Sequence, residues 1–259
     1  MSYRFQQALT RLPAANFAQG LTNAQLGPPD LAAALVQHAA YCAALRRCGL
    51  EVHALPADPT HPDSTFVEDT AVLARGATIV TRPGAASRQG EVNPVLQALR
   101  DLGREAQCIT APGTVDGGDV CQAEDHFFIG VSARTNDAGA LQLAQLLRGH
   151  GYTASTVDIR DNRGLLHLKS GIAYLGDGRL VLAPELPPVE EFRAYELVRV
   201  EPVESYAANC VRINEHVLLA EGYPRLTATL GNLGYALITL PISEFRKMDG
   251  GLSCLSLRF

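Results

Sequence analysis

Residues 230–241 are Leu230-Gly-Asn-Leu-Gly-Tyr-Ala-Leu-Ile-Thr-Leu-Pro241, a stretch in which a predicted helix ends at glycine and leads into a short apolar strand closed by proline. Four further stretches have related patterns, each closed by proline or aspartate, at intervals of roughly 40 to 50 residues. They span residues 45–56, 99–112, 147–158 and 192–202. A period of this length is typical of propellers and solenoids.

Four predicted hairpins lie between these stretches. In each, turn-forming residues separate two apolar or alternating runs, from Thr70 to Val80, Val120 to Ile129, Gly171 to Leu182 and Cys210 to Leu219. Each unit is therefore predicted to run strand, strand, helix, strand.

The fifth unit can be completed only if the two ends of the chain meet. Its hairpin strand would be Leu252 to Phe259, and its helix would be the first one, capped by Asp30 and ended by Gly49. We therefore expect an α/β fold, a five-bladed propeller of ββαβ repeats with approximate fivefold symmetry. Its N- and C-terminal segments would close the ring.

Composition limits what the chain can be. Its 259 residues, 47% of them hydrophobic, can bury a sizeable core, and no linker is evident, so one domain over residues 1–259 is expected. The net charge of −5 includes no basic block, which disfavours nucleic acid and anionic membranes as partners. The first residues lack the apolar core of a signal peptide, and no apolar run approaches the roughly 18 residues needed to span a bilayer. A cytoplasmic location is expected.

The six cysteines contain no C-x-x-C pair, which argues against a disulfide framework and a structural zinc site. Five of them are expected to be small buried hydrophobes. Cys254 differs because it follows Gly250-Gly251, which permits close backbone approach, and precedes an alternating apolar run. We expect it at the mouth of a buried strand, where it would act as a nucleophile.

A segment with polar residues precedes the first strand of each unit, and we name these five the leading segments. They are residues 66–69, 115–119, 167–171, 206–209 and 248–254. The approximate symmetry would bring them to one end of a central channel. Thiol, imidazole and carboxylate groups would then converge, which is the combination that nucleophilic catalysis requires.

Seven motifs in this order resemble a known family over essentially the whole chain. They are Asp63-Ser-Thr-Phe-Val-Glu-Asp69, Thr81-Arg-Pro-Gly-Ala-Ala-Ser-Arg88, Ala111-Pro-Gly-Thr-Val-Asp-Gly-Gly-Asp119, Ser132-Ala-Arg-Thr-Asn136, Leu166-His-Leu-Lys169, Ser205-Tyr-Ala-Ala-Asn-Cys210 and Asp249-Gly-Gly-Leu-Ser-Cys254. The chain is similar to the dimethylarginine dimethylaminohydrolases of the guanidine-modifying (pentein) superfamily.

The resemblance implies hydrolysis of N-methylated arginine to citrulline and a methylamine, without metal or organic cofactor. Cys254 would attack the guanidinium carbon and form a covalent thiouronium. His167 would protonate the leaving amine and then activate water, and Asp116 would orient the imidazole. Some relatives carry glutamate in place of Asp116, and aspartate is shorter by one methylene, so its carboxylate has to lie closer to the imidazole.

The same resemblance implies a set of substrate-binding residues. Asp69 would hold the guanidinium, Arg88 and Arg134 would grip the carboxylate, and Asp63 would take the α-amino group. The remaining expected pocket residues are Leu21 on a mobile lid, whose carbonyl would also meet the α-amino group, together with Phe66, Glu68 and Met248.

Several of these positions have ordinary structural alternatives. Glu68 could instead orient Asp69, the two arginines could be surface charges, and Leu21 could be a simple loop residue. Asp249 is equally compatible with a tight turn, and Asp119 is expected to satisfy strand-end amides.

Two other functions remain open from the sequence. Arginine deiminases of the superfamily usually place a second acidic residue two positions after the histidine, where this chain has Lys169. That lysine favours a methylated substrate, whose methyl groups leave no N–H donors for such an acid. The second alternative is a non-catalytic binding protein on the same fold, which an intact cysteine, histidine and acid set disfavours. Whether the chain forms a homodimer is also open.

Overall fold

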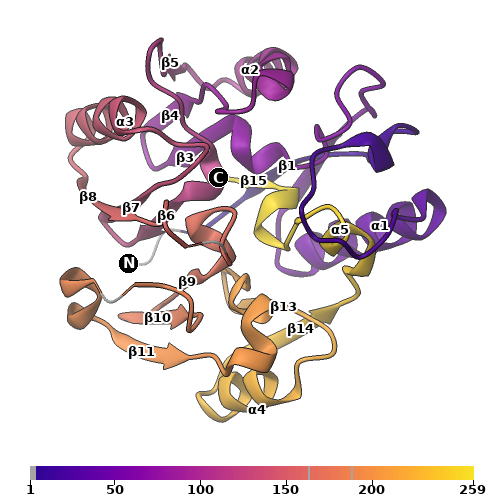
Figure 1. Cartoon of the computed structure of the whole chain (residues 1–259), viewed down its shortest axis with the longest axis vertical. Helices are drawn as coiled ribbons and strands as arrows, with labels where there is room; N and C mark the ends of the chain where they lie inside the picture. The colour runs from indigo at the N-terminus through magenta and orange to yellow at the C-terminus, as the bar shows by residue number, and fades with distance from the viewer. Residues whose placement is uncertain (1–3, 163, 188) are drawn as a thin grey trace.

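The computed structural model describes residues 4–162, 164–187 and 189–259, so residues 1–3, 163 and 188 of the expected single domain lie outside it. In the described residues, fifteen strands form five three-stranded sheets. Figure 1 shows these sheets around a common centre, with helices toward the periphery. The fold is thus α/β, built from five small sheets as the repeats predicted.

Four units follow one another along the chain. The first contains β3 (Ala71–Ala74), β4 (Ala77–Val80), α2 (Val92–Asp101) and β5 (Gln107–Cys108). The second contains β6 (Val120–Ala123), β7 (His126–Val131), α3 (Asp137–Gly149) and β8 (Thr153–Asp158). The third contains β9 (Ile172–Gly176), β10 (Arg179–Leu182), η6 (Glu190–Ala194) and β11 (Glu196–Arg199). The fourth contains β12 (Val211–Ile213), β13 (His216–Ala220), α4 (Pro224–Asn232) and β14 (Ala236–Leu240).

Strand pairing repeats from unit to unit. The first two strands pair antiparallel through a tight turn, as in the β6–β7 register of Val120 with Ile129. The chain then crosses over, and the third strand pairs parallel to the second, as in the β7–β8 register of Phe127 with Ala154. The four predicted hairpins are confirmed, because each pair of strands flanks the expected turn.

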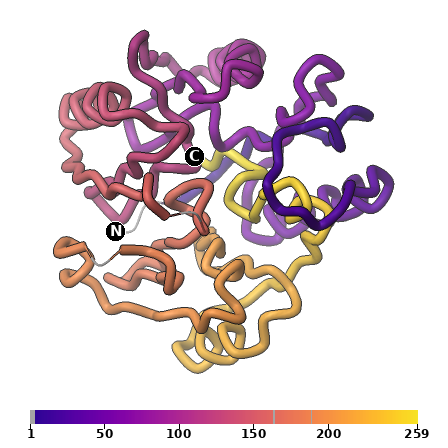
Figure 2. The backbone as a smooth tube through the Cα atoms, viewed as in Figure 1, coloured from indigo at the N-terminus to yellow at the C-terminus, as the bar shows by residue number. Residues whose placement is uncertain are grey.

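The fifth sheet joins the two ends of the chain. It contains β15 (Leu257–Arg258), β1 (Gln7–Arg11) and β2 (Glu51–Leu55), with α1 (Leu31–Arg47) between the last two. In β15 and β1, Leu257 pairs with Leu9, and the Gln6 amide donates to the Phe259 carbonyl at 2.8 Å. Figure 2 shows the first and last segments side by side. The C-terminal residues are therefore part of a sheet.

Two predicted elements are wrong in detail. The helix expected before residue 196 is only the short 3₁₀ helix η6, because Pro184 and Pro187 disfavour a helix in the first part of the crossover between β10 and β11. The strand expected over 252–259 is confined to Leu257–Arg258, since Ser253–Leu255 form a 3₁₀ turn. By contrast, the Asp30 cap is confirmed, because its carboxylate accepts the Ala33 amide at 2.8 Å.

The apolar core divides into clusters between neighbouring sheets and helices. Leu45 and Tyr41 of α1 pack with Leu255 near the C-terminus, and Leu257 and Phe259 pack with Leu99 of α2. Four cysteines, at 42, 48, 121 and 210, are buried as expected, but Cys108 is exposed at the end of a sheet. Within the described part of the chain, no helix is both long enough and apolar enough to cross a membrane.

Candidate active site

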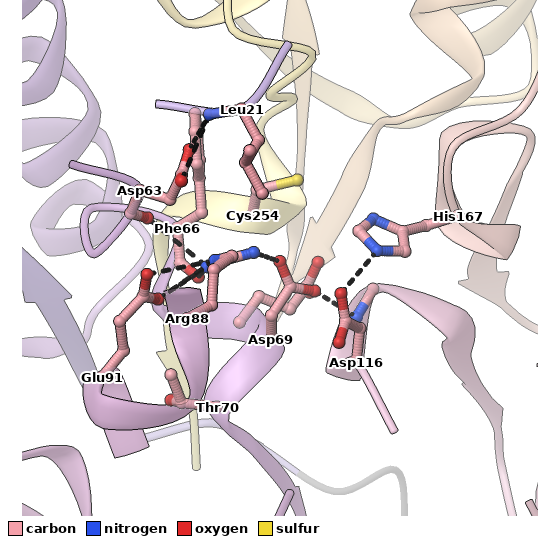
Figure 3. Close-up of polar contacts among 12 residues, drawn as sticks. Leu21, Asp63, Phe66, Asp69, Thr70, Arg88, Glu91, Asp116, His167 and Cys254 are labelled. Atoms are coloured by element: carbon pink, nitrogen blue, oxygen red, sulfur yellow. Dashed lines mark hydrogen bonds and ion pairs between the residues drawn. The ribbon is translucent and has the colours of Figure 1, made fainter. Parts of the chain in front are cut away.

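The five leading segments fold as 3₁₀ turns, which we call the leading turns. They are η2 (Val67–Thr70), η4 (Gly117–Asp119), η5 (Leu168–Ser170), η7 (Pro202–Ala208) and η8 (Ser253–Leu255). Four of the five segments contribute to one pocket, lined by Leu21, Asp63, Phe66, Asp69, Arg88, Asp116, Arg134, Leu166, His167, Met248, Asp249, Gly250 and Cys254. In Figure 3, Cys254 and His167 face each other across it, with Asp69 and Asp116 below. The segment over 206–209 does not line the pocket.

Cys254 lies within the last leading turn, η8, and two residues separate it from the strand that follows, β15. The glycine pair before it permits the expected close approach. A Cβ on Gly250 would lie 2.2 Å from the Phe66 ring, and one on Gly251 would lie 2.4 Å from the Asn209 side chain. The Gly251 amide donates to Cys254 Sγ at 3.4 Å. The Asp-Gly-Gly segment thus packs tightly and presents the half-buried thiol to the pocket.

Burial, followed by the Glu68 and Asp69 carboxylates, raises the pKa of Cys254 to about 12. The thiolate is the reactive form, so its fraction rises tenfold per pH unit below the pKa. Alkylation by iodoacetamide is therefore expected to be slow at pH 7 and to accelerate about tenfold per pH unit through pH 9. Mass spectrometry of the Cys254 peptide measures the rate, in a Cys108→Ser background because Cys108 is exposed.

A cationic ligand beside Asp69 is expected to accelerate that alkylation. L-Lysine supplies a positive charge but has no guanidinium carbon for the thiol to attack. L-Citrulline, whose side chain is neutral, is the matched control for a ligand that simply shields the thiol from iodoacetamide. A free-enzyme rate that is already fast and independent of pH near neutrality would contradict the raised pKa.

His167 and Asp116 form a direct pair. Their Nε2 and Oδ2 atoms are 3.0 Å apart, and both side chains are buried. The Gly84 amide donates to the other Asp116 oxygen at 2.8 Å, which fixes the carboxylate. Asp116 therefore reaches the imidazole despite its short side chain.

The charge of His167 is set by its surroundings. Burial alone lowers its pKa, but Asp69, Asp116 and Asp119 outweigh burial and raise the pKa to about 9. The imidazolium is thus favoured at neutral pH, where it can donate a proton.

Asp69 and Arg88 are ion-paired within the protein. Arg88 Nη1 lies 2.5 Å from Asp69 Oδ2, and Arg88 Nη2 lies 2.8 Å from Glu91 Oε2. Arg88 also donates to the Phe66 carbonyl at 3.1 Å. Burial raises the pKa of Asp69, but His167 and Arg88 outweigh it and lower the pKa to about 2. To grip a substrate carboxylate as expected, Arg88 would have to share or exchange these contacts.

Glu91 is a residue that the sequence interpretation missed. It is buried, and burial raises its pKa to about 7 even though Arg88 opposes the shift. In the sequence, the only signal of its role is that it follows Arg88 by three residues, a spacing at which the two side chains lie on the same face of the helix η3.

The loop containing Leu21 covers the pocket. The Leu21 amide, rather than its carbonyl, is engaged, and it donates to Asp63 Oδ1 at 3.0 Å. Asn23 N donates to Asp249 Oδ2 at 2.6 Å, so the loop is tied to the C-terminal segment as well. Asp249 has φ of 57°, the left-handed geometry of a tight turn. The enclosed volume of about 30 Å³ is smaller than an amino acid.

The other expected pocket residues divide into two groups. Phe66, Met248 and Arg134 line the pocket, with the first two buried. Glu68 was expected to line the same pocket, and this is wrong, because its side chain lies against a second cavity on the other side of the leading turns. Glu68 and Asp69 are consecutive in the 3₁₀ turn η2, where successive side chains point about 120° apart, so the two carboxylates face different sides of the turn. Lys169 faces that second cavity too, with Nζ 2.6 Å from Glu68 Oε1.

Asp119 has the structural role that was expected. It accepts hydrogen bonds from Ser132 Oγ at 2.6 Å, Thr135 Oγ1 at 2.7 Å and the Leu168 amide at 2.9 Å. These contacts hold the segment that carries His167.

Asp69, Asp116 and His167 each place a potential metal-ligand atom within 4.8 Å of the others. They are the one such group among the residues that the structure describes. Arg88 neutralises Asp69, and Asp116 is hydrogen-bonded to His167, so protein groups already satisfy these atoms.

Comparison with known proteins places the chain among enzymes of one kind. Residues 29–194 match the family described as "N,N dimethylarginine dimethylhydrolase, eukaryotic". The chain is 44% identical over 256 residues to the N(G),N(G)-dimethylarginine dimethylaminohydrolase of Pseudomonas aeruginosa, covering 98% of this chain and 100% of that one. The corresponding protein of Streptomyces coelicolor is 35% identical, over 98% and 96% of the two chains.

Solved structures agree in fold. A cysteine-to-serine mutant of the Pseudomonas aeruginosa enzyme complexed with citrulline superposes with a TM-score of 0.95 at 43% identity, covering 99% of this chain and 100% of that one. The N-terminal domain of ArgZ, a cyanobacterial arginine dihydrolase, has a TM-score of 0.87 at 18% identity, over 97% and 96% of the two chains, which shows a shared fold.

Proposed function

The chain belongs to the dimethylarginine dimethylaminohydrolase family, and on that premise we propose that it hydrolyses Nω-methylated arginine to L-citrulline and methylamine or dimethylamine. The observation that carries the proposal is the convergence of Cys254, His167 and Asp116 on one pocket with Asp69 beside them. Thiol, general acid and cation-binding carboxylate are the groups that this reaction requires.

In the first step, Asp69 holds the substrate guanidinium, whose positive charge favours loss of the Cys254 proton to solvent water, since His167 is already protonated. The thiolate attacks the guanidinium carbon, and a C–S bond forms. The His167 imidazolium then donates its proton to the methylated nitrogen, and the C–N bond breaks with release of the amine. The carbon remains bound to Cys254 as a thiouronium.

In the second step, neutral His167 takes a proton from water, and the resulting hydroxide attacks the thiouronium carbon. The C–S bond breaks with Cys254 as the leaving thiolate. The hydroxyl proton then passes to that thiolate, so the carbon keeps the oxygen as the citrulline carbonyl and the Cys254 thiol is restored. Asp116 orients the imidazole in both steps and stabilises its charged form, as its 3.0 Å contact with Nε2 permits.

The substrate's α-amino and carboxylate groups bind at the other end of the pocket. Arg134 and Arg88 are proposed for the carboxylate and Asp63 for the amine, which would replace the Leu21 amide as its partner. Because the enclosed volume is smaller than the substrate, the Leu21 loop has to open for binding.

The test is incubation of the purified protein with asymmetric dimethylarginine, monomethylarginine and arginine, with citrulline measured. We expect kcat/KM for the methylated substrates to exceed that for arginine by about tenfold or more. Lys169 faces the second cavity, so the position two residues after His167 supplies no acidic partner for the second side of an unmethylated guanidinium. Comparable values would move the assignment to a deiminase. No citrulline at any pH would favour the binding protein.

We further propose that the five units form a closed five-bladed propeller and that residues 1–259 are one catalytic domain. The pairing of β15 with β1 and the clusters shared between units support both statements. The cytoplasmic location stays a prediction from the sequence.

A further inference from the structure

Glu68 lies at the centre of a buried ion cluster beneath the candidate active site. Its Oε1 atom lies 2.6 Å from Lys169 Nζ and 3.1 Å from Arg258 Nη2, and its Oε2 accepts from Ser253 Oγ at 2.7 Å. Glu68 is 3% exposed. These partners face a second cavity of about 850 Å³, opposite the pocket that holds Cys254.

Three of the four cluster residues lie within two positions of a residue of the proposed mechanism. Glu68 precedes Asp69, Ser253 precedes Cys254, and Lys169 follows His167 by two residues. The cluster therefore connects the three leading turns that carry the cation-binding carboxylate, the nucleophile and the general acid.

Arg258 strengthens the connection from the C-terminal strand. Its Nη1 atom donates to the carbonyls of Ser253 at 3.2 Å and Ser256 at 2.9 Å. Arg258 thus holds the nucleophile's turn through the Ser253 carbonyl, and Glu68 holds it through the Ser253 hydroxyl. Removing a buried carboxylate leaves its cationic partners uncompensated, so this contact is costly to break.

We propose that Glu68 is a positioning residue that, through Ser253, Lys169 and Arg258, fixes Cys254 relative to His167 and Asp69. This inference rests on the proposed function for its catalytic consequence. A placement error of about 1 Å can reduce a rate by about 10²-fold, so a rigid connection between these turns matters for catalysis.

The cluster also places opposite charges near the thiol. After burial, Glu68 is the largest influence that raises the pKa of Cys254, and Lys169 lowers that pKa. Removing one charge or the other should therefore change thiol reactivity in opposite directions. A residue needed only for folding would not produce this pattern.

The experiment is a double-mutant cycle of Glu68→Gln and Lys169→Met in the Cys108→Ser background. The glutamine keeps the side-chain size and an acceptor for Ser253. We expect Glu68→Gln to raise the rate of Cys254 alkylation at pH 8 about threefold or more, Lys169→Met to lower it similarly, and the double variant to fall between them. Lys169→Arg should restore the wild-type rate.

Steady-state kinetics with dimethylarginine provide the second measurement. We expect Glu68→Gln to lower kcat about tenfold while KM changes less than about twofold, because the residue touches no substrate. Glu124→Gln is the matched control, since Glu124 lines the same second cavity but is not part of the ion cluster. It should leave both measurements unchanged.

Alkylation requires no substrate, so it tests the inference even if the wild-type protein forms no citrulline. Absence of citrulline would reject the proposed function alone. Alkylation rates that rise in both single variants, fall in both, or change in neither would overturn the positioning role. If Glu68→Gln fails to fold, Lys169→Met and its arginine counterpart decide, because Lys169 is the more exposed partner.

Discussion

Replacement of Cys254 with serine is expected to lower citrulline formation from dimethylarginine by at least about 10³-fold, with the fold unchanged. A serine hydroxyl is a far weaker nucleophile than a thiolate, and the substrate's charge cannot ionise it near neutral pH. The half-buried thiol lies in a pocket whose walls the substitution leaves in place. Citrulline assays under single-turnover conditions measure the effect.

A matched control is available in the same protein. Cys108→Ser changes an exposed cysteine that does not line the pocket and should retain wild-type kcat and KM. Mass spectrometry of wild-type protein quenched during turnover should show the thiouronium on Cys254 and on no other cysteine. Equal activity of Cys254→Ser and wild type would reject the mechanism.

Removal of residues 255–259 is expected to unfold or aggregate the protein. Leu255, Leu257 and Phe259 are buried, and burial of each side chain contributes about 1.5–3 kcal/mol. Together they approach the whole stability of a typical domain, about 5–15 kcal/mol. The truncation also leaves Tyr41 without its partner Ser256, whose hydroxyl lies 2.7 Å away. Soluble yield and circular dichroism on heating measure the loss.

Point substitutions separate this effect from a general intolerance of change. Leu257→Ala should destabilise the protein by about 2–5 kcal/mol, whereas Leu141→Ala, at a side chain that is 56% exposed, should change stability by less than about 0.5 kcal/mol. A truncated protein with wild-type melting behaviour would show that the C-terminal residues are a dispensable tail.

Much of the fold was predictable because its signals are local. Turn residues between alternating runs located the hairpins, and Asp30 before an apolar period located α1. The missed elements depend on other factors. Pro184 and Pro187 disfavour a longer helix before β11. The 3₁₀ turn over residues 253–255 follows Gly250 and Gly251, which pack closely against Phe66 and Asn209 of other units.

The sequence predicted which residues belong to the site better than it predicted the contacts among them. Repeat position and motif order located the residues that line the pocket, but neither could show that Arg88 is ion-paired to Asp69 and Glu91. The orientation of Glu68 was missed because the direction of its side chain depends on the 3₁₀ turn over Val67–Thr70, which the sequence did not predict. Contacts between distant turns are three-dimensional facts that spacing along the chain does not encode.

The leading turns also show how chemistry arises from a departure from symmetry. Asp69, Asp119 and Asn209 each accept an amide hydrogen bond from the next turn, at Gly118, Leu168 and Ser253 respectively. The Cys254 amide donates to the Gly251 carbonyl at 3.2 Å, just as the Asn209 amide donates to the Tyr206 carbonyl at 3.3 Å, so the thiol occupies the position that Asn209 has in its own turn. Three turns supply cohesion through the same kind of side chain. The fifth turn is held instead through Ser253 and Arg258. The position equivalent to Asn209 is therefore available for the nucleophile Cys254.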